Sequence, residues 1–392
     1  MGRVFFPLDE QLGLLPGGYS PFLVETMVRL GARLPFGQVA EEMRLLFGVS
    51  VSSDTVRRLT EQAGRLELAI EEDALTQLED QAPEEPEGPA VQQLSADGVM
   101  VHLVNGKWTE VRTTAIGEVG ERGGKPHVGA ISYFSRRCSA DEFIRQATLP
   151  TYERGTRRAR TVVAVMDGAT WLQELIDEQC PAAVRIIDFA HVAGYLADAA
   201  HAALGTDTPE AKAWLDEWVP RLKTREPEEV VAALRVLPTS TDDAVRQKRT
   251  ALRYLRSRRA QIRYAAFQQQ GYPIGSGMVE SGGKLVVEAR LKGSGMRWKD
   301  QNISPLVALR GRLCSGEWEQ VWPQIQQEWL AETKHHKQEG RSRRQLKRAA
   351  ERAAPSTPST VPASTRERHK AVIDGKPTAA HPWKKYRACS AA

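Results

Sequence analysis

The sequence predicts an α/β protein built around a mixed β-sheet, and two observations carry this prediction. Three strand-like segments follow one another between residues 91 and 135, with the turn-like stretch GERGGKP before the third. Two apolar segments, TVVAVMDGA (161–169) and AVRIIDFAH (183–191), then alternate with helical stretches. Because a segment that is apolar throughout is typical of a strand buried on both faces, these two predict a parallel half of the sheet.

The first 66 residues predict helices, two of them in a helix-turn-helix-like arrangement. One helix is expected at roughly 36–46, and a turn containing Gly48 follows it. A second helix is expected to open after Ser52 or Ser53, which are both suitable N-caps. Arg57 and Arg58 would lie on or near the exposed side of this second helix and contact DNA. An ordinary pair of packed helices is the structural alternative.

Changes of composition along the chain predict six parts. These are a helix-turn-helix-like DNA-binding domain (1–66), an acidic and Pro-rich linker (67–90), the first part of the sheet-containing core (91–191), an all-α insertion (192–272), the last part of the core (273–330), and a basic, largely disordered tail (331–392).

Composition limits the classes of protein to which the chain could belong. No apolar run is long enough to cross a membrane, and the N-terminus lacks the features of a secretory signal, so a cytoplasmic, nucleoid-associated protein is expected. The four cysteines include no pair at CxxC spacing, so neither a zinc site nor a disulfide framework is expected.

Charge is distributed unevenly along the chain. The net charge is +5, but residues 331–392 hold fifteen Lys or Arg and only five Asp or Glu, which leaves the remainder slightly acidic. A basic tail on a near-neutral body predicts a polyanionic partner, most simply nucleic acid. A solvated tail that aids solubility is the alternative.

Three acidic residues occupy positions that favour catalysis. Asp97 lies in the first predicted strand, Asp167 ends a buried strand, and Glu280 lies near the start of a later helix. If the first strand neighbours 161–167, the carboxylates converge, and a divalent cation is then needed to offset their repulsion. Their hard oxygen ligands suit Mg²⁺ or Mn²⁺, and two such ions can serve phosphodiester chemistry. Taken singly, Asp167 before Gly168 could be only a turn, and Glu280 could pair with Lys284.

A second cluster of candidate functional residues, Asp188 and His191, ends the next strand. The pair could be metal ligands, DNA contacts, or a buried hydrogen-bonded pair that fixes the end of the strand.

Several longer motifs resemble a known family. They are PLDEQLGL (7–14), MDGATW (166–171), IIDFAHVAGYL (186–196), PIGSGMVES (273–281) and RLKGSGMRW (290–298). Together with Asp97, Asp167 and Glu280 in this order, they resemble DDE transposases, which have an RNase H-like core, and more narrowly the insertion-sequence family ISKra-four. The resemblance covers about residues 5–325.

The resemblance implies metal-dependent DNA cleavage and strand transfer, with Asp97, Asp167 and Glu280 as the catalytic and metal-binding acids. It makes Asp188 and His191 a supporting pair, or Asp188 the alternative second acid. Residues expected to contact DNA phosphates are Lys284, Arg290, Lys292, Arg297 and Lys299. Trp298 is expected to stack on an unpaired base or, equally, to pack on the all-α insertion.

The partners implied are double-stranded DNA, as transposon terminal inverted repeats and target DNA, and further copies of the chain in a homodimer or higher oligomer. Two other functions are compatible with the sequence. One is a catalytically inactive or truncated transposase-derived protein that binds transposon ends, and the other is an RNase H-like nuclease that does not transpose.

Overall fold

The computed structural model of the chain describes residues 14–15, 18–353, 372–373 and 376–377. The chain divides into two units, Met1–His335 and His336–Ala392. The first unit holds the five-stranded sheet and all the predicted site residues. Most of the PLDEQLGL motif and the low-complexity stretch 354–365 lie outside the described residues.

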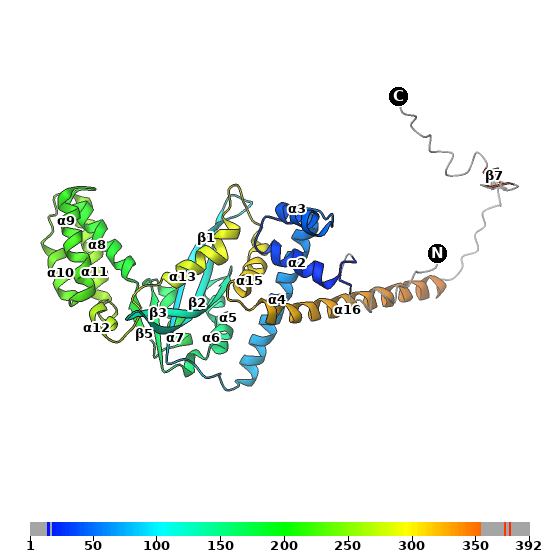
Figure 1. Cartoon of the computed structure of the whole chain (residues 1–392), viewed down its shortest axis with the longest axis horizontal. Coiled ribbons are helices and arrows are strands. Elements are labelled where there is room, and N and C mark those ends of the chain that lie inside the picture. Colours follow the sequence, from blue (N-terminus) through cyan, green and yellow to red (C-terminus); the bar gives the residue numbers. More distant parts are fainter. Residues whose placement is uncertain (1–13, 16–17, 354–371, 374–375, 378–392) are drawn as a thin grey trace, which may run out of the picture. The chain divides into compact units, whose positions relative to one another are not determined.

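A five-stranded mixed sheet forms the centre of the first unit, as the sequence predicts (Figure 1). Its strands are β1 (Val91–His102), β2 (Trp108–Arg122), β3 (Lys125–Arg136), β4 (Thr161–Met166) and β5 (Val184–Ile187). They lie in the order β3-β2-β1-β4-β5, with β1, β2 and β3 antiparallel and β1, β4 and β5 parallel. The predicted parallel half is therefore present.

Local sequence explains the strands and their connection. All residues of β4 after Thr161 are buried, which accounts for its uninterrupted apolar run. The β2–β3 hairpin turns at Gly123 and Gly124, whose φ angles of 61° and 72° belong to a turn that glycine adopts without strain. The long hairpin is thus set by its two-glycine turn.

Helices cover both faces of the sheet. On one face, α5 (Ala140–Gln146) and α7 (Thr170–Gln179) belong to an apolar cluster that includes Leu94, Ile116 and Met166. Short α6 (Thr148–Glu153) and η1 (Thr156–Arg158) lead from α5 to β4. On the other face, α13 (Gly277–Gly282) packs against β1, β2 and β3. Helix α15 (Ile303–Cys314) packs against β3, the outermost strand, and the hydroxyl of Ser315, which follows this helix, accepts from the Tyr133 N–H at 2.9 Å.

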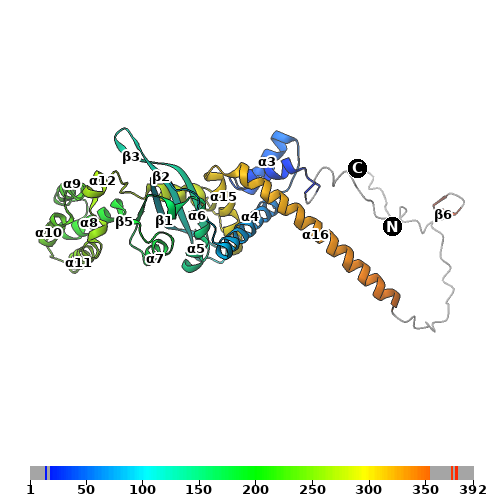
Figure 2. The ribbon, with the colours of Figure 1, turned by 90° about the horizontal axis from the view of Figure 1, so that it is seen from below.

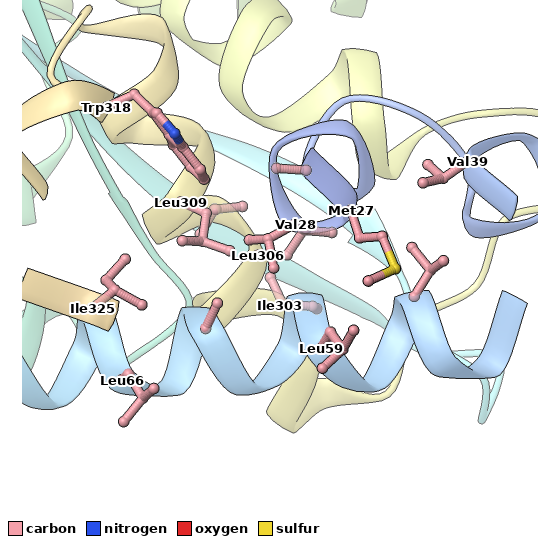
Figure 3. Close-up of a cluster of buried hydrophobic side chains, with 14 of the residues drawn as sticks. Met27, Val28, Val39, Leu59, Leu66, Ile303, Leu306, Leu309, Trp318 and Ile325 are labelled. Carbon is pink, nitrogen blue, oxygen red and sulfur yellow. The ribbon is translucent and has the colours of Figure 1, made fainter. Parts of the chain in front are cut away.

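Three helices precede the sheet: α2 (Pro21–Gly31), α3 (Phe36–Phe47) and α4 (Ser53–Gln81). Gly48 ends α3 in the left-handed conformation, and the Ser52 side chain caps α4 by accepting from the Thr55 N–H. Figure 3 shows side chains of these helices meeting those of α15 and of the helix that begins at Trp318 in one apolar cluster. The N-terminal helices and the end of the core therefore share one hydrophobic interior.

The predicted linker at 67–90 is wrong in its first half. Helix α4 continues unbroken to Gln81, so only residues 82–90 lack helix or strand before β1. The acids of this segment are not a solvated run, because Glu67 and Glu71 are buried and pair with Arg312 at 2.8 and 3.2 Å. Glu71 also pairs with buried Arg136. These ion pairs hold the second half of α4 against the core.

Between β5 and α13 the described chain forms helices joined by short loops and contains no strand. The elements are α8 (Phe189–Leu204), α9 (Pro209–Thr224), α10 (Pro227–Val236), α11 (Asp242–Ser257), η2 (Arg259–Gln261) and α12 (Tyr264–Gln269). They share a hydrophobic cluster with Val163, Val165, Ile186 and Ile187 of the sheet. Figures 1 and 2 both show α8 to α11 grouped together beyond β5.

The chain returns to the sheet as one continuous helical run. It comprises α13, the π-helical segment η3 (Gly283–Glu288) and α14 (Ala289–Leu291), and η4 (Asp300–Asn302) then precedes α15. Gly282 permits the close approach of α13, because a Cβ there would lie 2.7 Å from the Tyr133 ring.

The prediction that the chain is largely disordered from residue 331 is wrong for its first part. Helix α16 runs from Trp318 to Ala353, since residues 331–353 consist mostly of good helix formers and contain no proline. The described residues beyond it form two short strands, β6 (Val372–Ile373) and β7 (Lys376–Pro377). Among the described helices, none is both long and apolar enough to cross a membrane.

Candidate active site

The pairing of β1 with β4 positions the first two predicted acids. The parallel register ends with Leu94 opposite Ala164, and Asp97 and Asp167 each follow three residues later. Because both strands run in the same direction, the two aspartates reach the same level of the sheet. They also share a face, opposite to that of Leu94, Ala164 and the cluster around α7.

Helix α13 brings the third acid to this face. Asp97 is directly opposite Thr113 in β2, so their side chains point to the same side of the sheet. A Cβ at Gly282 would lie 3.5 Å from the Thr113 side chain. Glu280 is two residues earlier on the same helix and is exposed. Three separate segments thus supply one acid each to one region.

The pKa of Asp97 indicates that the three acids lie near one another. Partial burial raises the pKa of Asp97 above its usual range, and the negative charges of Asp167, Glu280 and Glu110 raise it further. The Gly98 N–H opposes these effects by donating to Asp97 Oδ1 at 2.7 Å. Asp97 therefore lies close enough to both predicted partners to respond to their charge.

Only some of the carboxylate oxygens of the three acids accept hydrogen bonds. Asp167 Oδ1 accepts from the Ala169 N–H at 2.8 Å, much as Asp97 Oδ1 accepts from Gly98. Within the described chain, the Oδ2 atoms of both aspartates and the Glu280 carboxylate accept no hydrogen bond and make no ion pair. The alternative pair of Glu280 with Lys284 is not formed in this structure. Each acid keeps at least one oxygen available to a ligand.

The three carboxylates are close but not drawn tightly together. In the described part of the first unit, no three His, Cys, Asp or Glu side chains bring one ligand atom each within 4.8 Å of one another. Like charges without a counter-ion disfavour closer approach. The arrangement is therefore an open cluster of acids.

Asp188 differs from these acids. It is 6 % exposed, and both its oxygens accept backbone N–H groups: Oδ1 that of His191 at 2.9 Å and Oδ2 that of Ser276 at 2.6 Å. Phe189 N–H also donates to the Ile274 carbonyl at 3.0 Å. Asp188 thus caps α8 and ties the 274–276 segment to the end of β5. The His191 ring is not its partner, because that side chain is exposed and lies against Tyr195 and Tyr254.

Two residues of the helical segment after β5 support the turn that follows Asp167, and sequence reasoning missed both. Arg258 Nη2 donates to the Gly168 carbonyl at 2.7 Å. The Tyr254 ring packs on the same turn so closely that a Cβ at Gly168 would lie 2.7 Å from its hydroxyl oxygen. A hydrogen bond between residues 90 positions apart leaves no local signal in the sequence. The basic character of the helix was the only hint.

Sequence reasoning also missed Glu110, whose charge reaches Asp97 from β2. Its carboxylate pairs with Arg112 at 2.5 Å, and a Cβ at Gly98 would clash with it. The hairpin register pairs Glu110 with Met100, three residues beyond Asp97, and the sequence alone does not fix that register.

The predicted DNA contacts after Glu280 divide into two groups. Lys284, Arg297 and Lys299 are exposed and form no ion pair within the described chain, whereas Lys292 pairs with Glu288 at 2.8 Å. Arg290 does not belong on an exposed DNA-binding surface, which corrects the expectation for it. Trp298 is packed rather than exposed, but its ring meets Phe36 of the N-terminal helices and not the all-α insertion.

Arg290 and Trp298 are buried, at 2 % and 9 % exposure. The guanidinium of Arg290 lies over the rings of Phe36 and Trp298, 4.6 and 5.0 Å from their centroids. The Trp298 indole N–H donates to the Leu291 carbonyl at 3.0 Å, so the ring is not available to an unpaired base. Both side chains instead join the 290–298 block to the N-terminal helices.

The two arginines at the start of α4 are already engaged by acids. Asp54 accepts from Arg57 at 2.6 Å and from Arg58 at 3.0 Å, and Glu61 accepts from Arg57 at 2.8 Å. Part of their charge is therefore compensated within the helix.

Comparison with protein families and with curated proteins identified no relative of this chain. No family model matches the chain, and no curated protein matches it either. Its function is therefore inferred from its own residues and their geometry.

Proposed function

We propose that this chain is a DDE-type transposase that cleaves DNA and transfers strands with the help of divalent cations. The observation that carries the proposal is the grouping of Asp97, Asp167 and Glu280 at one edge of the sheet, where partial burial and then the charges of the other two acids raise the pKa of Asp97. Three acids gathered from separate segments incur electrostatic repulsion, which is more characteristic of a ligand site than of a structural cluster.

The sheet supports an RNase H-like assignment of the core. The order β3-β2-β1-β4-β5, with an antiparallel half and a parallel half, agrees with the core that the transposase resemblance implies. The helical segment 189–269 agrees with the insertion expected before the last acid. Asp167 is the better candidate for the second acid, because both oxygens of Asp188 accept backbone N–H groups.

The donor set fits Mg²⁺ or Mn²⁺. Asp97, Asp167 and Glu280 offer only carboxylate oxygens, and each has an oxygen that accepts no hydrogen bond within the described chain. Two bound ions would supply activation of water or a 3′-hydroxyl and neutralisation of charge on the phosphodiester.

The chain's own residues orient these ligands. The N–H groups of Gly98 and Ala169 each hold one aspartate oxygen and so direct the other. Arg258, through the Gly168 carbonyl, fixes the turn on which Asp167 stands. These hydrogen bonds hold the ligand carboxylates in place before DNA binds, which is a condition for efficient catalysis.

Exposed cations provide a binding surface for DNA. Lys284 lies on the helical run that carries Glu280, and Arg297 and Lys299 follow it; contacts from such residues position a duplex without reading its sequence. For the N-terminal helices we keep the proposal of a helix-turn-helix, supported by the Gly48 turn and the Ser52 cap. Assembly of two or more copies on DNA remains part of the proposal, since transposition joins two ends.

Cleavage of plasmid DNA that carries the sequences flanking this coding region tests the proposal. Wild-type protein should cut at the ends with Mg²⁺ and not with EDTA. Asp167→Asn should reduce the cleavage rate at least about a thousandfold, because it removes a ligand charge needed in the transition state, while DNA affinity changes less than about twofold.

The matched control is Asp198→Asn, which makes the same change at an exposed aspartate of α8 and should cut like wild type. Wild-type rates from Asp167→Asn would show that this residue is not catalytic. If the wild-type protein binds the DNA but does not cleave it, the result would instead favour a transposase-derived DNA-binding protein that no longer cuts.

A further inference from the structure

A cavity lined by apolar and charged residues lies where α3 and the start of α4 meet the 296–302 segment. It has a volume of about 500 Å³. Its apolar wall is formed by Pro35, Phe36, Val104 and Met296, and Trp298 completes the aromatic side. The cavity lies wholly within the first unit and is open to solvent at residues such as Val104.

Arg290, which lines this cavity, carries a buried charge with no acid beside it. Its side chain is 2 % exposed, and it forms no ion pair within the described chain. Its Nε donates to the Gly31 carbonyl at 3.1 Å, but its buried Nη2 has no hydrogen-bond partner. Burial and the nearby charge of Arg310 lower the pKa of Arg290 to about 10. A buried guanidinium in this condition is stabilised by any anion that can reach it.

The remaining charged groups of the cavity also favour an anion. Arg297 and Lys299 are exposed at its edge and form no ion pair within the described chain. The acid among the lining residues is Glu61, which is occupied by Arg57 at 2.8 Å and by the Asn302 amide at 2.7 Å. Arg290, Arg297 and Lys299 therefore present positive charge that no lining acid offsets.

We propose that this cavity binds a phosphate group, with Arg297 and Lys299 contacting its oxygens and Arg290 supplying charge from the interior. Guanidinium and ammonium groups together are the usual ligands of phosphate in proteins. The cavity is larger than a phosphate requires, and its apolar wall suits the sugar or other organic group that carries it. The phosphate belongs either to the backbone of a DNA strand or to a free phosphorylated molecule.

The cavity is distinct from the acidic site. Leu103, whose backbone pairs with Trp298, follows Asp97 by six residues along the β1 direction. At ~3.3 Å per residue this places the two regions about 20 Å apart, so the phosphate held here is not the one being cleaved. Binding at the cavity can therefore be measured without cleavage, and it can succeed or fail independently of the proposed catalysis.

Two variants of the full chain test the proposal. Arg297→Ala/Lys299→Ala removes the edge charges, and its control Arg122→Ala/Lys125→Ala removes the same charges from the β2–β3 hairpin, where both side chains are exposed. Val104→Trp fills the cavity without changing charge, and its control is Val236→Trp at another exposed valine.

The first measurement is titration with inorganic phosphate against chloride of equal ionic strength, followed by thermal unfolding. The second is the affinity of a labelled 20-base-pair duplex over a range of salt concentrations. We expect both test variants to weaken binding at least tenfold relative to their controls. The salt dependence of duplex binding should also become shallower, by about 0.9 for each phosphate that the variant no longer neutralises.

The two measurements identify the source of the phosphate. Weaker binding in the duplex measurement, with or without weaker binding in the phosphate titration, supports a DNA backbone phosphate. Weaker binding in the phosphate titration alone supports a free phosphorylated molecule. The proposal is overturned if both test variants match their controls in both measurements. It is also overturned if only the charge removal acts and Val104→Trp does not, because an exposed basic surface would then explain the effect.

Discussion

Two aspartates that end neighbouring strands of the same sheet have opposite surroundings. Asp167, after β4, uses one oxygen to accept the Ala169 N–H and leaves the other without a hydrogen bond in the described chain. Asp188, after β5, is buried and uses both oxygens to accept backbone N–H groups from two segments. The comparison teaches that a strand-end aspartate is a candidate ligand only where the backbone leaves it an oxygen to offer.

The largest effect on stability should come from a substitution of Asp188, whose two carboxylate oxygens both accept hydrogen bonds. Asp188→Asn replaces one acceptor oxygen by a donor NH₂ group that faces a backbone N–H, and it removes the charge from both hydrogen bonds. We expect a loss of about 1.5–3 kcal/mol in the free energy of unfolding, measured by denaturant titration. The same change at Asp167 should cost less than about 0.5 kcal/mol, because the retained oxygen can still accept from Ala169.

Equal destabilisation by the two changes would break the comparison. It would mean that the fold uses the Asp167 carboxylate as fully as that of Asp188, so that Asp167 is not available to bind a metal ion.

A second test removes the support of Asp167 rather than Asp167 itself. Arg258→Ala deletes the hydrogen bond to the Gly168 carbonyl, so the turn that carries Asp167 should lose its fixed position. A displacement of this kind should lower the cleavage rate roughly tenfold to a hundredfold with little change in DNA affinity.

The control for Arg258→Ala is Arg256→Ala, an exposed arginine two positions earlier with no ion pair in the described chain. If the two variants lose activity equally, the effect is one of lost positive charge, and Arg258 does not position the site.

The smallest effect should appear in the pH dependence of stability, measured without divalent cations. The pKa of Asp97 is raised in the folded protein, so ionised Asp97 destabilises the fold at neutral pH. This cost is absent below the pKa of the unfolded chain, about 3.9, and it grows as pH rises through the folded pKa. Asp97→Asn should therefore raise Tm at pH 7.5, and the gain should disappear as pH falls towards 4.

A Tm gain of Asp97→Asn that stays constant from pH 4 to 7.5 would show that the gain does not depend on ionisation of Asp97, and it would contradict the raised pKa. The single variant Glu280→Gln should raise Tm by less than Asp97→Asn does, with the same pH profile, since the charge of Glu280 is one of the weaker influences on the pKa of Asp97.

The sequence predicted the sheet well because its signals were local. The apolar run before Asp167 and the succession of three strands were sufficient to predict a mixed sheet, and the sheet register then brought Asp97 and Asp167 to one level. Likewise, Gly48 and Ser52 marked the end of one helix and the start of the next.

The sequence predictions failed where charged residues were expected to be exposed to solvent but are buried in the fold. The acidic run after residue 67 looked like a linker, but Glu67 pairs with Arg312 from α15, 245 positions away. Arg290 was predicted to contact DNA, and Trp298 either to stack on a base or to pack on the insertion, yet both pack against Phe36 in a core that only the tertiary fold assembles. Neither partner could be identified from residues near these side chains in sequence.

Binding of Mn²⁺ tests most directly whether Asp97, Asp167 and Glu280 form a metal site. The titration uses full-length protein at pH 7.5 and follows the signal of unbound Mn²⁺ by electron paramagnetic resonance. Wild type and Glu174→Gln, a control at an exposed glutamate of α7, should bind Mn²⁺ equally, whereas Glu280→Gln should weaken binding at least tenfold, about 1.4 kcal/mol. A wild-type protein that binds no Mn²⁺, or a Glu280→Gln variant that binds it as tightly as the control, would contradict the assignment.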